Sequence, residues 1–154
     1  MLPEQLSRIE KSIIIEAPRS RVWRALTDIN EFGSWFGVTT EGSFAPGARV
    51  EMTPKSGDYG FETFVVYVER MEAERYFSWR WQPGAYEPET NYYREPLTLV
   101  EFHLDDVNEG TRLRVIESGF DLITLQRRAK VLAENTSGWE EQLNAIAKHV
   151  QQSA

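Results

Sequence analysis

Residues 124–151 read TLQRRAKVLAENTSGWEEQLNAIAKHVQ, and this stretch is the strongest indication of architecture in the chain. Apolar or small side chains recur along it at steps of four and three: Leu125, Ala129, Leu132, Thr136, Trp139, Leu143, Ile146 and Val150. This spacing is typical of one buried face of an α-helix. We therefore predict a single helix from about Thr124 to Gln151, roughly 40 Å long at 1.5 Å per residue.

Gly138 lies inside this pattern and leaves one alternative open. A glycine within a helix costs roughly 1 kcal/mol relative to alanine, so a break near Asn135 to Gly138 is the competing interpretation. The phase of the apolar stripe is unchanged across the glycine, and this favours a continuous helix.

The residues before this helix predict short antiparallel strands. Apolar side chains alternate on one face of Glu62 to Arg70 and of Tyr76 to Gln82, and we expect these faces to point inward. Turn signals at residues 45–47, 54–58 and 72–74 divide Gly42 to Gln82 into a meander. Further strands at Leu97 to Leu104 and Thr111 to Ser118 flank residues 105–110, whose Asn and Gly suit a hairpin turn.

The N-terminal part predicts one strand and two short helices. Ile9 to Ala17 holds a β-branched run that ends at Pro18, and Pro18 suits the first turn of a helix over Ser20 to Thr27. Residues 28–31, Asp-Ile-Asn-Glu, can cap a second helix whose apolar content is entirely aromatic: Phe32, Trp35 and Phe36.

The segment Pro83 to Pro96 is predicted to be a long loop. It contains three prolines and three tyrosines and has no hydrophobic periodicity. Loops of this length in compact domains are functional or mobile, so we interpret it as a lid.

Composition excludes several classes of protein. A formal net charge of −7 and a pI near 4.9 argue against nucleic acid as a partner. The sequence has no cysteine, which excludes disulfides and thiolate metal sites and fits a cytoplasmic location. It shows neither a secretory signal nor an apolar run near the ~20 residues that cross a bilayer. The length of 154 residues suits one domain over 1–154, with an ordered core of about 8–151.

Several local motifs, taken in order, resemble a known superfamily. They are Ile-Glu-Ala-Pro at 15–18, Val-Trp-Arg-Ala-Leu-Thr-Asp at 22–28, Trp-Phe at 35–36, Glu-Ser-Gly-Phe at 117–120 and Gly-Trp at 138–139. Together they resemble the branch named after the activator of heat-shock protein 90 ATPase, within the SRPBCC group of START-like or Bet v 1-like proteins.

That resemblance implies an α+β helix-grip fold. In this fold a curved antiparallel sheet of about six to seven strands wraps a long C-terminal helix, with two short helices after the first strand. It also implies a cavity between sheet and helix that the superfamily uses for lipids, hormones, polyketides and other small apolar molecules. The co-chaperone that names the branch has an additional N-terminal domain, so chaperone activation is not implied. Fold alone transfers no reaction.

We expect the inward aromatic side chains to line such a cavity and to bind a small apolar ligand. A fully packed aromatic core is the alternative, because aromatic rings dominate cores as well as pockets. The predicted ligand-binding residues are Trp35, Phe36, Phe64, Trp79, Trp81, Phe102, Val115, Glu117, Trp139 and Leu143.

Glu117 is the polar residue of greatest interest in this set. It shares strand parity with Leu113 and Val115, so it is expected to point inward, where desolvation would raise its pKa and suit an acid or base. The alternatives are that parity fails at the strand end, or that Glu117 pairs with Arg80 or Arg114. Glu62 is a second, weaker candidate of the same kind. If either carboxylate acts chemically, the protein is a small cyclase, dehydrase or hydrolase.

Other chemistry is not indicated. His103 is outward by parity and His149 lies near the chain end, so we expect no metal pair, and we predict no metal and no cofactor. Phosphate-loop, Gly-x-Ser-x-Gly and His-Glu-x-x-His motifs are absent. Arg127, Arg128 and Lys130 are interpreted as a solvated helix face. A co-chaperone-like interaction module, with a protein partner or a homodimer, remains a further alternative.

Overall fold

The computed structural model is described over residues 7–55, 63–83 and 96–152. Within these residues, seven strands form one antiparallel sheet in the order β1-β7-β6-β5-β4-β3-β2. The strands are β1 Arg8–Ile15, β2 Val38–Glu41, β3 Arg49–Pro54, β4 Phe64–Glu72, β5 Tyr76–Trp81, β6 Thr98–Val107 and β7 Gly110–Ser118. The helices are α1 Arg19–Thr27, α2 Ile29–Phe36, the short 3-10 turn η3 Phe120–Leu122, and α3 Leu125–Gln152.

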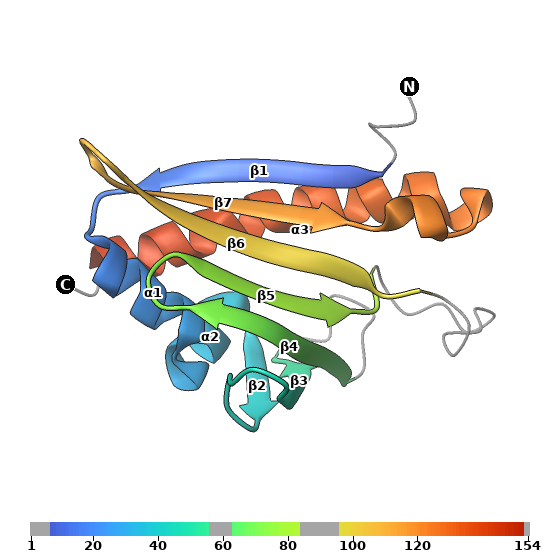
Figure 1. Cartoon of the computed structure of the whole chain (residues 1–154), viewed down its shortest axis with the longest axis horizontal. Helices are drawn as coiled ribbons and strands as arrows, with labels where there is room; N and C mark the ends of the chain where they lie inside the picture. Colours follow the sequence, from blue (N-terminus) through green and yellow to red (C-terminus); the bar gives the residue numbers. More distant parts are fainter. Residues whose placement is uncertain (1–6, 56–62, 84–95, 153–154) are drawn as a thin grey trace.

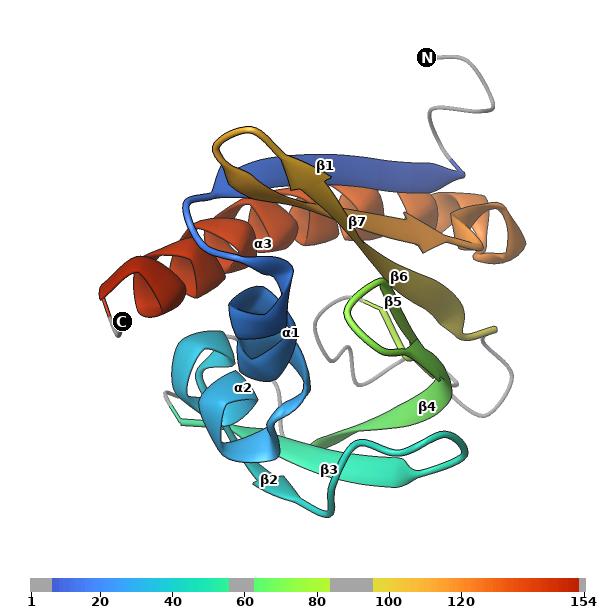
Figure 2. The ribbon, with the colours of Figure 1, turned by 60° about the vertical axis from the view of Figure 1, so that its left-hand side comes forward.

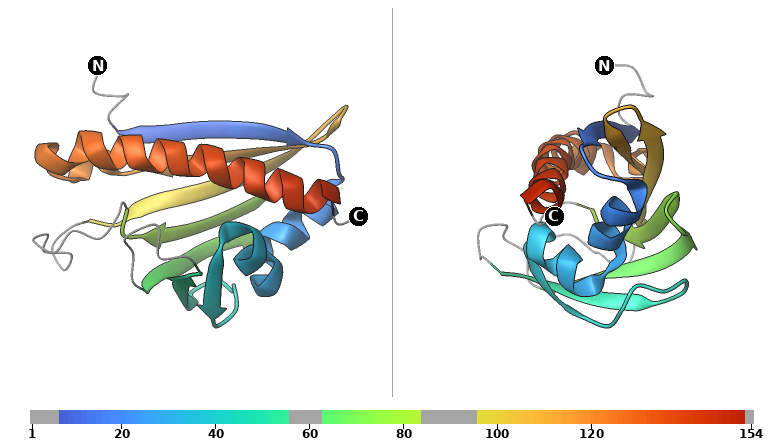
Figure 3. Two further views of the ribbon diagram at one scale, coloured as in Figure 1. Left: turned by 180° about the vertical axis from the view of Figure 1, so that it is seen from behind. Right: turned by 90° about the vertical axis from the view of Figure 1, so that its left-hand side faces the viewer.

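The sheet is strongly curved, and α3 lies along its concave face, beneath β1 and β7 (Figures 1 and 3). Helices α1 and α2 follow β1 and lie between α3 and the β2–β3 edge of the sheet (Figure 2). This is the predicted α+β architecture, and α3 is continuous through Gly138 as predicted.

Local signals place the two short helices. Pro18 is the N-cap of α1, with extended backbone, one position before the first turn. Asp28 caps α2, and its side chain accepts hydrogen bonds from the backbone N–H groups of Asn30 and Glu31. Helix α2 ends at Gly37, which adopts the left-handed conformation that glycine favours at this position. Asp28 and Gly37 therefore determine where α2 begins and ends.

Three strand predictions need adjustment at their ends. The segment expected to turn at 105–110 is mostly strand, because β6 runs to Val107 and β7 begins at Gly110, leaving Asn108 and Glu109 as a two-residue turn. The first strand ends at Ile15 instead of Ala17. Just before the predicted meander, which was expected to begin at Gly42, β2 is an additional short strand that pairs with β3.

The beginning of the helical stripe was predicted wrongly. Leu125 is 73% exposed and Ala129 is also exposed, whereas Arg127 and Val131 are buried. Figures 1 and 3 show that α3 begins beyond the ends of β1 and β7, so its first turn is not covered by the sheet. The prediction that Arg127 lies on a solvated basic face is also wrong, because Arg127 is buried. Arg128 donates to the backbone oxygens of Asp121 and Ile123, and Lys130 pairs with Glu134 at the surface.

No helix among the described residues is long and apolar enough to span a bilayer. Two predictions lie outside the described residues: Glu62, and residues 84–95 of the loop interpreted as a lid.

Candidate functional site

Glu117 lies in the interior near the end of β7. Its neighbours across the sheet are Ile9 of β1 and Val100 of β6, and its side chain points to the concave face as strand parity predicted. The residue is 0% exposed. Neither predicted arginine pairs with it, because Arg80 binds Glu69 and Arg114 binds Glu10 on the opposite face.

Four neutral donors bind the carboxylate of Glu117. Oε1 accepts from Trp139 Nε1 at 2.8 Å and from Asn135 Nδ2 at 3.0 Å, both from α3. Oε2 accepts from Trp81 Nε1 at 2.8 Å and from Thr98 Oγ1 at 2.5 Å, both from the sheet. An ionised carboxylate offers about four acceptor positions, so these donors fill its hydrogen-bonding capacity.

Burial and hydrogen bonding act on Glu117 in opposite directions. Burial raises the pKa of its carboxyl group, since desolvation penalises the charged form. Hydrogen bonds from Thr98, Trp81, Trp139 and Asn135 favour the charged form without reversing that shift, so the pKa remains above its ordinary value. Glu117 therefore has the perturbed titration that is common at functional sites.

Aromatic rings surround this carboxylate. Trp81 and Trp139 stack with their ring centroids 5.7 Å apart and an angle of 29° between their planes. Trp79 and Phe102 contact Trp139 from the sheet at 6.5 and 5.6 Å, and Phe36 contacts it from α2 at 6.3 Å. The rings thus form a continuous layer between the sheet, α2 and α3.

The aromatic layer is not equally covered along its length. Phe102 and Trp79 are almost completely buried, whereas Trp81 and Phe64, toward the other end of the same inward face, are partly exposed. Phe64 meets the Trp81 ring edge to face at 5.9 Å. Trp79 has a further feature: its Nε1–H is buried and has no hydrogen-bond partner among the described residues.

The remaining predicted lining residues divide into two groups. Val115 and Leu143 are buried in the same core, with Val115 opposite Phe102 in the β6–β7 ladder. Trp35 is buried too, but its Nε1 donates to the backbone oxygen of Ala25 at 2.8 Å and so fastens α2 to α1. Trp35 therefore has a structural contact that the sequence did not predict.

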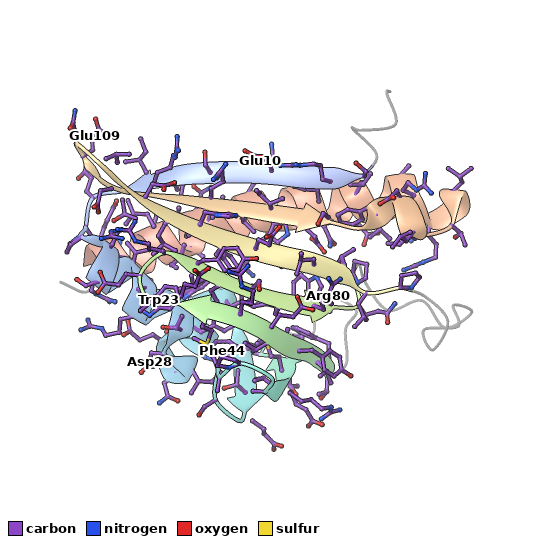
Figure 4. The ribbon with its side chains drawn as sticks, in the orientation of Figure 1. Glu10, Trp23, Asp28, Phe44, Arg80 and Glu109 are labelled. Carbon is purple, nitrogen blue, oxygen red and sulfur yellow. The ribbon has the colours of Figure 1, made fainter. Side chains whose placement is uncertain are left out.

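Sequence reasoning missed Thr98, Asn135 and Phe44. Asn135 precedes Trp139 by one helical turn, a spacing that could have identified it as a neighbour on the same helix face. Thr98 follows the predicted loop and carries no comparable signal. Phe44, labelled in Figure 4, packs at 5.1 Å against Phe32 and at 6.3 Å against Trp79, although it lies in the connection between β2 and β3.

A second polar cluster joins the three helices. Glu31 of α2 binds Arg21 and Arg24 of α1 and His149 of α3, each at 2.9 Å. Partial burial acts to raise the pKa of Glu31, but hydrogen bonds from His149, Arg21 and Arg24 outweigh it and lower that pKa. His149 thus has an ionic partner, and no cluster of potential metal ligands occurs in residues 7–55, 63–83 and 96–152.

A curved antiparallel sheet that holds a long C-terminal helix over an aromatic interior defines a helix-grip protein of the Bet v 1-like, or SRPBCC, fold family. The family model described as "Activator of Hsp90 ATPase homolog 1-like protein" matches residues 16–151, and the chain belongs to this family. No protein of curated function matches the sequence.

Solved structures share the fold at low sequence identity. Protein MLL2253 from Mesorhizobium loti is 20% identical with a TM-score of 0.76, over 96% of this chain and 98% of that protein. DynU16, a putative protein in the dynemicin biosynthetic locus, is 22% identical with a TM-score of 0.70, over 94% of this chain and 47% of that one. The Aha1 dimer from Colwellia psychrerythraea is 17% identical with a TM-score of 0.71, over 93% of this chain and 95% of that one.

Proposed function

We propose that the protein binds a small apolar molecule against the aromatic layer, at the end formed by Trp81, Phe64, Phe36 and Trp139. The observation that carries this proposal is the uneven cover of the inward face. Trp79 is fully buried, but Trp81 and Phe64, which face the same way, remain partly exposed. Partly exposed aromatic rings that continue a buried apolar surface are typical of small-molecule sites.

The location of DynU16 in a biosynthetic locus is consistent with small-molecule binding, although its likeness to this chain is limited to the fold.

Binding can be tested with the neutral fluorescent probe N-phenyl-1-naphthylamine. We expect saturable binding that raises probe emission and shifts tryptophan emission. Trp81→Ala should abolish it. Trp23→Ala is the matched control, because Trp23 lies on α1 and contacts Phe77 rather than the rings around Glu117 (Figure 4). Folded wild-type protein that binds no probe, or equal loss in both variants, would contradict the proposal.

Native mass spectrometry provides a second, independent test. Protein purified from its own host should carry a retained small molecule, and Trp81→Ala protein from the same host should carry less of it. This measurement identifies the mass of the ligand, which neither the fold nor the probe can provide.

Acid–base catalysis in the same site is a second candidate, favoured by the complete burial and raised pKa of Glu117. The four hydrogen-bond donors around Glu117 weigh against catalysis, since a substrate group would have to displace one of them to exchange a proton with the carboxylate. If a reaction is found, Glu117→Gln should abolish it, and retention of activity would exclude Glu117 as the acid or base.

A cytosolic interaction module that self-associates is a third candidate. Leu122, at the end of η3, is 63% exposed, and Leu125, at the beginning of α3, is 73% exposed. The solved Colwellia relative is described as a dimer. Sedimentation velocity should show a dimer that Leu125→Ser weakens if this surface mediates association, and a monomer at all concentrations would exclude it.

A further inference from the structure

The groups around the fully buried Glu117 differ in charge from those around Glu31, a partly buried carboxylate that also has several partners. Glu31 is surrounded by Arg21, Arg24 and His149. Glu117 is more deeply buried, yet all four of its partners are neutral, and no Arg, Lys or His side chain in the described part of the chain bonds to it. A buried carboxylate without a full positive charge nearby is an electrostatic cost.

From this contrast we infer that the ligand carries a positively charged nitrogen, held by the partly exposed rings of Trp81 and Phe64 in front of the buried carboxylate of Glu117. The inference rests on the proposed function, because it names the chemical class of the molecule that this site binds. An organic ammonium ion would supply the missing positive charge.

The two indoles that bind Glu117 favour a cation for a second reason. Both Trp81 and Trp139 donate their ring N–H to the same carboxylate. Hydrogen bonds to an ionised acceptor polarise the donor, which leaves the face of the indole more negative. Trp is already the strongest cation–π partner among the side chains. When Glu117 is ionised, the accessible indole face of Trp81 should therefore be more favourable to a cation than that of an unbonded tryptophan.

Neighbouring rings shape the place where the cation would sit. One face of Trp81 stacks on Trp139, Phe64 meets its ring edge to face at 5.9 Å, and Phe36 lies at 6.4 Å. The accessible part of Trp81 is thus bordered by two further aromatic rings from β4 and α2. Several ring faces around one position are the arrangement that recognises quaternary ammonium groups.

Only the ionised carboxylate attracts a cation, so binding should depend on pH. The groups that face Glu117 are Trp81 and Thr98 from the sheet and Asn135 and Trp139 from α3, and none of these titrates near neutrality. Since burial raises the pKa of Glu117, affinity for a cation should increase as pH rises through that pKa. Affinity for a neutral molecule should not follow this curve.

A pair of probes of equal shape tests the inference. Benzyltrimethylammonium has a positively charged quaternary nitrogen where neopentylbenzene has a neutral quaternary carbon, and the two are otherwise alike. The affinity of each can be measured by displacement of N-phenyl-1-naphthylamine. We expect wild-type protein to bind the cation about tenfold more tightly than the neutral probe. In Glu117→Gln the ratio of the two affinities, measured in that same variant, should fall to about one. The matched control is Glu69→Gln, since Glu69 pairs with Arg80 on the outer face.

The outcomes separate this inference from the proposed function. Equal or tighter binding of the neutral probe by wild-type protein would overturn the cation while leaving apolar binding intact, and binding of neither probe would overturn both. If Glu117→Gln does not fold, Trp81→Phe keeps an aromatic ring but loses the N–H donated to Glu117, and it should reduce the preference for the cation. An unchanged preference in Trp81→Phe, together with a flat pH profile for wild-type protein, would also overturn the inference.

Discussion

Replacing Glu117 by glutamine probes the hydrogen-bond network that organises the interior. A glutamine amide has one oxygen that can accept and one NH₂ that cannot. If the oxygen takes the position of Oε1, Trp139 and Asn135 keep their acceptor, and the Thr98 hydroxyl can turn to accept from the NH₂. The indole N–H of Trp81 then faces the NH₂ and loses its acceptor.

The expected loss of stability follows from that single unpaired donor. An unsatisfied donor costs about 1–3 kcal/mol, and removal of a buried charge offsets part of this cost, so we expect a net destabilisation of about 1–2 kcal/mol. Glu117→Ala removes the acceptor from all four donors, including the buried Thr98 and Trp139, and should cost roughly 4 kcal/mol or more. This approaches the low end of the total stability of a typical domain, about 5–15 kcal/mol.

Urea denaturation followed by tryptophan fluorescence measures these changes, with Glu69→Gln as a surface control expected to cost at most about 1 kcal/mol. The pH dependence gives a further check. A carboxyl group with a raised folded-state pKa contributes most stability below its ordinary pKa, and that contribution declines as pH rises toward the raised value. The cost of Glu117→Gln should therefore be larger near about pH 5 than near about pH 8. A cost equal to that of Glu69→Gln at both pH values would refute this reasoning.

Four other positions give simpler predictions. Gly138→Ala should stabilise the protein by about 0.5–1 kcal/mol in urea denaturation, because nothing lies near the added Cβ and alanine favours a helix. Gly110→Ala should destabilise it by about 1–3 kcal/mol or more in the same assay, since φ is +143° and the Cβ would meet the backbone oxygen of Ile15. Asp28→Ala should cost about 1 kcal/mol through loss of the α2 cap, visible as a lower thermal midpoint. Glu31→Gln should destabilise the protein near neutral pH. Because the pKa of Glu31 is lowered in the folded state, its stabilising contribution is complete above the ordinary carboxyl pKa and is lost as pH falls through the lowered one. Thermal melts at several pH values should therefore show a smaller difference between variant and wild type at acidic pH.

The inward faces of the strands were predictable because side-chain direction along a strand is a local property. Trp79 and Glu117 point inward as alternation requires, and the capping of α2 by Asp28 follows from neighbouring residues. The stripe on α3 was predictable only where the sheet covers it. A periodic pattern contains no information on where its partner surface ends, so the exposure of Leu125 was missed.

The sequence by itself therefore determined the order of the elements, the continuity of α3 and the inward direction of Glu117, since each depends on residues within a few positions of one another. Only the tertiary structure decided what Glu117 contacts. Its donors Trp81, Thr98, Asn135 and Trp139 come from two other strands and from α3, at separations of 18–36 residues. The curvature of the sheet around the helix brings these donors to one carboxylate, and no local pattern specifies that geometry.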